Sequence, residues 1–153
     1  TISRRQRQMC IRDSPYIDVS QKNKLSQNKQ AGARKKPERV EGTLSCELPK
    51  TLVKKNDIHI TSKRNFDCFQ DTELDMLLKR TLDVKNIIIC GVNTDTCVYG
   101  TTFGASNRGY NPIVIECCTG SMRGEDQHKT ALKIMSQSIA WVMKKEEILN
   151  KLN

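Results

Sequence analysis

The chain lacks any long apolar run, and its 153 residues are only 37% hydrophobic and 5% aromatic. No run approaches the roughly 18 residues that a membrane-spanning helix needs, so we expect no membrane partner. Residues 1–14 also lack the apolar stretch of a secretory signal peptide. The seven cysteines show no C-x-x-C spacing, which argues against a zinc module and a disulfide scaffold. Free thiols without a secretory signal predict a reducing compartment, and we expect a cytoplasmic protein.

Common cofactor and metal motifs are absent as well. The sequence contains no H-E-x-x-H, no G-x-x-x-x-G-K-[ST] and no G-x-G-x-x-G. Its two histidines, His59 and His128, do not have the spacing of metal ligands. We therefore expect no cofactor and no metal. His128 falls in the first turn of a predicted helix, where we expect it to bond locally.

Positive charge is concentrated near the amino-terminal end. Residues 1–37 hold ten of the 26 basic residues and two of the 17 acidic ones, whereas residues 38–153 are nearly neutral. The head has few large apolar side chains and cannot bury enough surface to offset its ordering entropy. We predict that residues 1–37 are a basic head of low order, or a non-native sequence, and that residues 38–153 form the domain. Nucleic-acid binding is the alternative function of such a head. With Tyr16 as its single aromatic residue, we do not expect that partner.

Strand and helix patterns alternate after Pro37. Residues 86–92 form a continuous apolar run, which is typical of a strand buried on both faces. Residues 125–138 place Ala131, Leu132 and Met135 on one helical face. The other predicted elements are strands over 58–61, 112–118 and 140–143 and helices over 72–80, 94–108 and 145–152. This order predicts the α/β class, with a parallel sheet covered by helices on both faces.

Two side chains follow predicted strands at their carboxyl ends, where open α/β sheets place their sites. Lys63 follows the strand 58–61, and Cys97 lies in the first helical turn after the strand 86–92. The helix dipole and unpaired N–H groups of that turn favour a thiolate and can stabilise an oxyanion. A lysine nearby would add a second positive charge. This arrangement suits acyl transfer by a thiol nucleophile.

Both residues also have a purely structural interpretation. Most free cysteines behave as small buried apolar residues, and we expect this of Cys90, Cys117 and Cys118 in the apolar strands. The same interpretation applies to Cys97, and Lys63 taken alone is a solvated lysine. Spacing by itself leaves both interpretations open.

Residues 87–98, with the sequence IIICGVNTDTCV, resemble the nucleophile segment of isochorismatase-like cysteine hydrolases. That family includes nicotinamidases and the ureidoacrylate and biuret amidohydrolases. The similarity extends over residues 38–153, through Leu48-Pro49, Lys63-Arg64, Asp71-Thr72, Arg108-Gly109-Tyr110, residues 114–120 and Trp141-Val142.

The resemblance implies a three-layer, Rossmann-like fold and hydrolysis of an amide or ureido C–N bond in a small molecule. By position, Cys97 would be the nucleophile and Lys63 the lysine of a Cys–Lys–Asp triad. A cis peptide bond would join Val92 to Asn93, and the N–H groups of Asn93 and Cys97 would form the oxyanion hole. We also expect a homo-oligomer, because the apolar edge beside residues 86–92 needs a partner.

One part of the family pattern is missing. The family's first strand ends in Asp-x-Gln and carries the triad aspartate, and no such segment precedes Lys63. Asp13 and Asp18 lie in the polar head, where neither can be assigned that role. The fold is therefore expected to be incomplete in its N-terminal part, and hydrolysis to be impaired because the triad base is absent. The alternative is a catalytically inactive relative that serves as an interaction or oligomerisation module.

Overall fold

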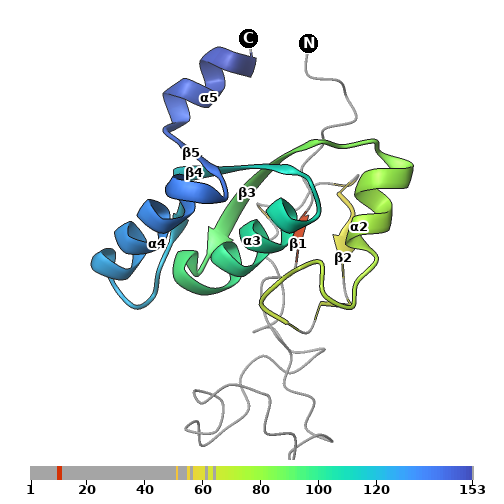
Figure 1. Ribbon diagram of the computed structural model, residues 1–153, viewed down its shortest axis with the longest axis horizontal. Coiled ribbons are helices and arrows are strands. Elements are labelled where there is room, and N and C mark those ends of the chain that lie inside the picture. Colours follow the sequence, from red (N-terminus) through yellow and green to blue (C-terminus); the bar gives the residue numbers. More distant parts are fainter. Residues whose placement is uncertain are drawn as a thin grey trace, which may run out of the picture.

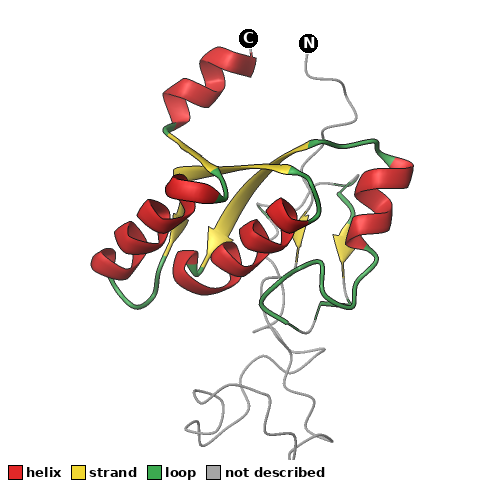
Figure 2. Ribbon diagram, viewed as in Figure 1, coloured by secondary structure: helices red, strands yellow, loops and turns green. Residues whose placement is uncertain are grey.

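A computed structural model describes residues 51, 55, 57–60, 62, 63 and 65–152, together with the backbone of residues 10 and 11. Figures 1 and 2 show helices and strands that alternate along the chain. The strands are β1 (Cys10–Ile11), β2 (His59–Ile60), β3 (Asn86–Val92), β4 (Asn111–Gly120) and β5 (Trp141–Met143). The helices are α2 (Leu74–Met76), η3 (Leu77–Thr81), η4 (Thr94–Val98), α3 (Tyr99–Asn107), α4 (Glu125–Ser138) and α5 (Lys145–Leu152).

Every strand pairing in the described part of the chain is parallel. β3, β4 and β5 form one sheet in that order, and β1 pairs with β2 in a separate small sheet. Ile88 lies opposite Ile113, and Ile113 lies opposite Trp141. The α/β class and its parallel sheet are confirmed.

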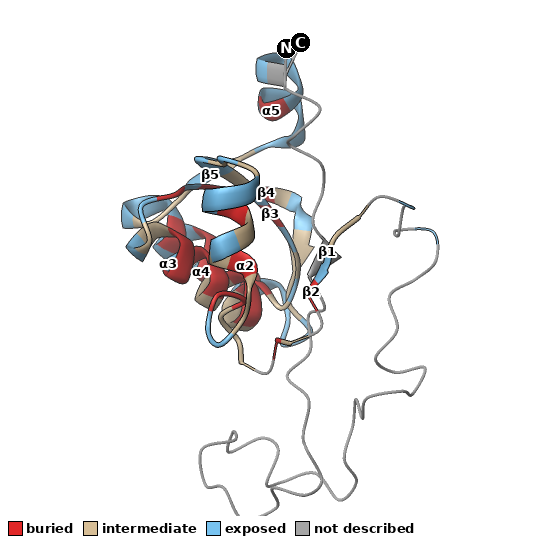
Figure 3. Cartoon of the chain, turned by 90° about the vertical axis from the view of Figure 1, so that its right-hand side faces the viewer, coloured by how far each residue is buried: buried red, intermediate tan, exposed pale blue. Residues whose placement is uncertain are grey.

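The hydrophobic core lies between one face of this sheet and the helices α2, α3 and α4. Ile89 and Val114 are register partners that point to this face, and they are 8% and 0% exposed. They belong to the same cluster as Leu132 and Met135 of α4. Figure 3 shows α2, α3 and α4 together on one side of the sheet. Burial at every second strand position follows from the two-residue period of a strand.

The opposite face of the sheet is covered in part by α5. Ile115 of β4 and Ile148 of α5 are both buried, yet neither belongs to the core cluster that contains Val114. Because neighbouring strand residues point to opposite faces, Ile115 lies on the second face, where α5 packs against β4. On that face Ile88 remains 44% exposed and Trp141 69% exposed.

The paired strands β3 and β4 lose their common register near their carboxyl ends. Ile89 lies opposite Val114, but Gly91 lies opposite Thr119, so β4 uses four residues where β3 uses one. Cys117 and Cys118 fall in this bulge and are exposed, as is Cys90 of β3. The prediction that these three cysteines are core residues is wrong, because alternation places Cys90 on the partly uncovered face and the bulge turns the other two outward.

Several predicted boundaries agree with the observed ones. β3, α4 and α5 span the residues predicted for them. The helix predicted over 94–108 consists of η4 and α3, and Gly109 ends it with a φ of +81°, which glycine adopts without strain. The division at residue 37 lies outside the described residues and stays a prediction. No helix among the described residues has the length and apolarity to cross a membrane.

Candidate active site

Cys97 lies in η4, the helical turn that begins two residues after β3 ends. The residue is 6% exposed. The Asn93 carbonyl oxygen accepts hydrogen bonds from the backbone N–H groups of Thr96 and Val98, both at 3.1 Å, and so closes the turn around Cys97. The peptide bond between Val92 and Asn93 is cis, at the position that the family resemblance implies. The sequence thus places Val92, Asn93 and Cys97 in one short strand-to-helix connection.

Lys63 lies three residues after β2 and is completely buried. The interpretation as a solvated lysine is therefore wrong. An ammonium group in the interior is strongly unfavourable unless hydrogen bonds or charges compensate it. Within the described residues, no buried side-chain nitrogen or oxygen lacks a hydrogen-bond partner. A contact between Lys63 and Cys97 stays a prediction.

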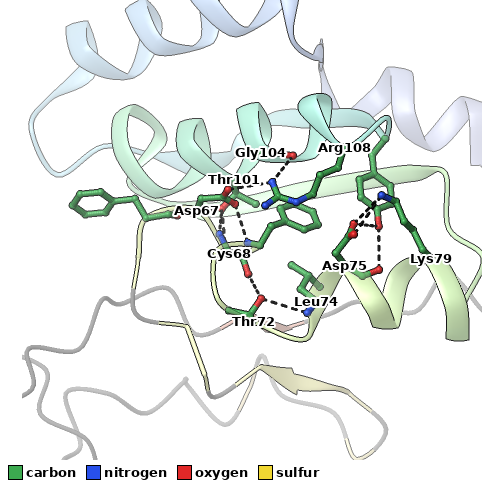
Figure 4. Close-up of polar contacts among 12 residues, drawn as sticks. Asp67, Cys68, Thr72, Leu74, Asp75, Lys79, Thr101, Gly104 and Arg108 are labelled. Carbon is green, nitrogen blue, oxygen red and sulfur yellow. Dashed lines mark hydrogen bonds and ion pairs between the residues drawn. The ribbon is translucent and has the colours of Figure 1, made fainter.

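The segment that follows Lys63 is fixed against α3, the helix that continues from η4. Figure 4 shows Asp67 and Cys68 directed toward Thr101 and Arg108 of the helix region. The Cys68 N–H donates to Thr101 Oγ1 at 3.2 Å, and Arg108 Nη1 donates to Asp67 Oδ2 at 3.4 Å. The Asp67 carboxylate also accepts a bond from the Phe69 N–H at 2.8 Å. These contacts connect the backbone after Lys63 to the helix after Cys97.

Gly104 permits this close approach, and Gly104→Ala should destabilise the protein. An added Cβ would lie 2.6 Å from Asp67 Cγ, so the carboxylate would have to leave its partners Phe69 and Arg108. We expect a loss of about 1–3 kcal/mol in the free energy of unfolding, measured by urea denaturation.

Gly100→Ala in the same helix is the matched control. Its added Cβ would meet its neighbours at 3.5 Å, an ordinary contact distance. Alanine is the better helix former, so this variant should be as stable as the native chain or up to about 1 kcal/mol more stable. Equal stability of the two variants would contradict the role given to Gly104.

The loop between β4 and α4 is bound to the turn that carries Cys97. Ser121 Oγ donates to Asp95 Oδ1 at 2.6 Å, and Arg123 forms an ion pair with the same carboxylate. The Met122 N–H donates to Asn93 Oδ1 at 3.0 Å. Although burial alone would raise the pKa of the Asp95 carboxyl, the bonds from Ser121 and Arg123 lower it below its ordinary value.

His128 reaches the same turn from α4. Its Nδ1 lies 2.8 Å from Thr94 Oγ1, and both side chains are buried. The expectation of a local bond in the first turn of α4 is wrong, because α4 packs against η4 and brings the ring to a partner 34 residues away. The bond holds the first residue of η4 against α4.

The structure assigns clear places to the predicted site residues and adds others. Val92, Asn93 and Cys97 share one turn, and Lys63 is in the interior. No group of three or more His, Cys, Asp or Glu side chains among the described residues has the arrangement of a metal site. Sequence analysis missed Arg123 and Ser121, whose bonds to Asp95 span 28 and 26 residues, and no local pattern marks them.

Comparison with known proteins adds a family assignment. A sequence model of the Isochorismatase domain matches residues 2–147. The uncharacterized isochorismatase family protein YecD of Escherichia coli O157:H7 is 33% identical over 97 residues, covering 63% of this chain and 50% of that protein. The chain thus spans about half the length of this relative.

Two solved structures resemble the fold. An isochorismatase-like hydrolase from Alkaliphilus metalliredigens has a TM-score of 0.69 and 25% identity, with 74% of this chain and 62% of that chain covered. The nicotinamidase SaPncA from Staphylococcus aureus has a TM-score of 0.53 and 33% identity, with 58% and 56% covered.

Proposed function

The chain belongs to the isochorismatase family, and from this premise we propose that it hydrolyses the C–N bond of a small amide or ureide with Cys97 as nucleophile. The observation that carries the proposal is the place of Cys97, buried in the turn that directly follows the parallel strand β3. Amino-terminal helical turns favour a thiolate over a thiol.

The proposed reaction has two steps. A general base takes the proton of the Cys97 thiol, the thiolate attacks the carbonyl carbon and forms a C–S bond, and the C–N bond breaks as the leaving nitrogen takes that proton from the base. Water then gives a proton to the same base and attacks the thioester carbonyl, and the C–S bond breaks as the acid leaves and the cysteine sulfur regains the proton. The N–H groups of Asn93 and Cys97 are our candidates for oxyanion donors in both steps. Lys63 is our candidate for a cationic group that stabilises the thiolate and the oxyanion.

The substrate class rests on the neighbours of known activity. SaPncA is a nicotinamidase, and so is the matched PncA of Bacillus subtilis, which is 26% identical with a TM-score of 0.63. The test is ammonia release by the purified chain from nicotinamide, an N-carbamoyl amino acid and a ureido acid. Release from none of them, together with a Cys97 that alkylates no faster than free cysteine, would overturn the proposal.

An interaction module is the second candidate function, and the uncovered sheet face favours it. Ile88, Val92 and Trp141 are 44%, 48% and 69% exposed. Exposed apolar side chains on one sheet face favour an interaction site, and they add to the apolar edge beside residues 86–92, on which we expect a homo-oligomer. A chain that self-associates in light scattering without turnover or fast Cys97 alkylation would favour this function.

The proposed chemistry needs a base, a role that the sequence alone assigns to neither carboxylate of the head. The pairing of β1 with β2 is an added observation that makes Asp13 a candidate. β1 pairs in parallel with β2, so the carboxyl ends of both strands meet at the edge from which Lys63 continues. Asp13 is the first carboxylate after β1 in the sequence, two residues on. It lies outside the described residues, and we propose it for the base on this sequence position alone.

Asp13→Asn should lower the rate of ammonia release by roughly 100-fold if Asp13 is the base. Asp18→Asn removes the other carboxylate of the head and should leave the rate unchanged. Equal effects of the two substitutions would remove Asp13 from the mechanism. Absence of turnover in the native chain, with Cys97 still reactive toward iodoacetamide, would instead support the expectation that hydrolysis is impaired.

A further inference from the structure

Arg123 joins the loop after β4 to the turn that carries Cys97. Its Nη1 forms an ion pair with Asp95 and donates to Thr96 Oγ1 at 2.7 Å. Asp95 and Thr96 are the two residues directly before Cys97 in the chain. One guanidinium group therefore contacts two consecutive side chains beside the proposed nucleophile.

The Asp95 carboxylate is unfavourable for a thiolate in the same turn. Its side chain is 11% exposed, so water screens its charge poorly. Like any aspartate with an ordinary or lowered pKa it is ionised at neutral pH, and the bonds from Ser121 and Arg123 lower its pKa. A nearby negative charge opposes ionisation of a thiol. Arg123 places a permanent positive charge on this carboxylate.

We propose that Arg123 is a positioning residue for Cys97: its guanidinium neutralises the Asp95 carboxylate and holds the nucleophile turn against the loop after β4. The inference rests on the proposed function, since it assumes that Cys97 reacts as a thiolate. Arg123 acts through Asp95 and Thr96, and it needs no contact with the substrate.

Other charged and titratable groups lie on the elements packed against η4, and apart from Lys129 in its control variant they are the same in every variant below. Besides Lys63 and Asp95, those on the elements packed against η4 are Cys90 of β3, Tyr99 of α3, Glu116, Cys117 and Cys118 of β4, and Glu125, Asp126, His128, Lys129 and Lys133 of α4. His128 is the one among these α4 groups with a described hydrogen bond to η4, at Thr94.

The test is the rate at which iodoacetamide alkylates Cys97 in the full chain, followed by peptide mass spectrometry from pH 6 to 10. Arg123→Gln should slow this alkylation about three- to tenfold at pH 7 and move its profile to higher pH, because Asp95 is then uncompensated. In the double variant Asp95→Asn, Arg123→Gln, the rate and the profile should return to within about twofold of native. If Arg123 had only a structural role, removal of the Asp95 carboxylate would not restore the alkylation rate of Cys97.

Two comparisons accompany the test. Lys129→Gln removes an exposed ion pair with Glu125 on the adjacent helix and should leave the profile unchanged. Cys90 serves as an internal reference: although the residue is exposed, desolvation of its thiol and the neighbouring Cys118 raise its pKa to about 11, so it alkylates slowly at pH 7.

A native pH profile of Cys97 alkylation in the Arg123→Gln variant would overturn the inference. An alkylation rate as slow in the double variant as in the single one would overturn it as well. Should Arg123→Gln fail to fold, Arg123→Lys keeps the charge and should retain the native profile. The proposed function fails differently, because native Cys97 would then alkylate no faster than free cysteine.

Discussion

Cys97→Ser should reduce hydrolysis at least about 1,000-fold in kcat/KM while leaving the fold intact. A serine hydroxyl is far less acidic than a thiol, so the turn that favours a thiolate yields no comparable nucleophile. The two side chains are close in size, and the buried position tolerates the exchange without a large cavity. The measurement is ammonia release from the amide that the native chain hydrolyses best.

Cys118→Ser is the matched control for this prediction. Cys118 is an exposed cysteine of the β4 bulge, outside the nucleophile turn. Its replacement should leave kcat/KM within about twofold of the native value, as expected for a surface exchange. Comparable losses in the two variants would show that general thiol chemistry, or instability, lies behind the effect of Cys97→Ser.

Lys63→Met should lower hydrolysis by roughly 100-fold without unfolding the chain. Methionine keeps the apolar stem of lysine and removes its charge, and apolar replacements of similar volume in place of buried ions are often neutral for stability. The loss should appear mainly in kcat, because the ammonium is proposed to stabilise charge that develops during the reaction. Steady-state kinetics measures the change in kcat and KM, and urea denaturation measures the change in the free energy of unfolding.

Lys79→Met is the corresponding control. Lys79 is exposed and forms an ion pair with Asp75 at 3.2 Å, a kind of pair that contributes at most about 1 kcal/mol. Its removal should change neither kcat nor KM. A native kcat in the Lys63→Met variant would show that Lys63 has no role in hydrolysis. Its burial would then be a matter of packing alone.

Local sequence patterns account for most of the fold. The spacing of Ala131, Leu132 and Met135 predicted α4, and all three are buried on the core side of the helix. The unbroken apolar run of β3 predicted a strand buried on both faces, but its alternate residues, such as Ile88, are exposed on the partly covered face. Periodicity specifies where an element lies, whereas the coverage of each face depends on segments distant in sequence.

Only those residues of the candidate site that lie close together in the sequence could be predicted from it. Val92, Asn93 and Cys97 fall within six consecutive residues, so one motif identifies them. Arg123 and His128 reach the same turn through the register of β4 and the packing of α4. The buried state of Lys63 likewise depends on the surrounding fold, because a lone lysine in a sequence is ordinarily a solvated residue.

The four-for-one bulge of β4 lengthens the segment that leads from the sheet to the loop bound to the Cys97 turn. β4 pairs regularly with β3 up to Val114 and with β5 up to Ile115, and the added length lies between these pairs and Ser121 and Arg123. A deletion within 116–118 would therefore shorten the segment that leads to this serine and arginine, while Asn86 to Ile89 keep their partners in β4 and Ile115 keeps its partner Met143. Changes in the length of this segment would therefore alter the contacts of Ser121 and Arg123 with the Cys97 turn and leave the paired part of the sheet in place.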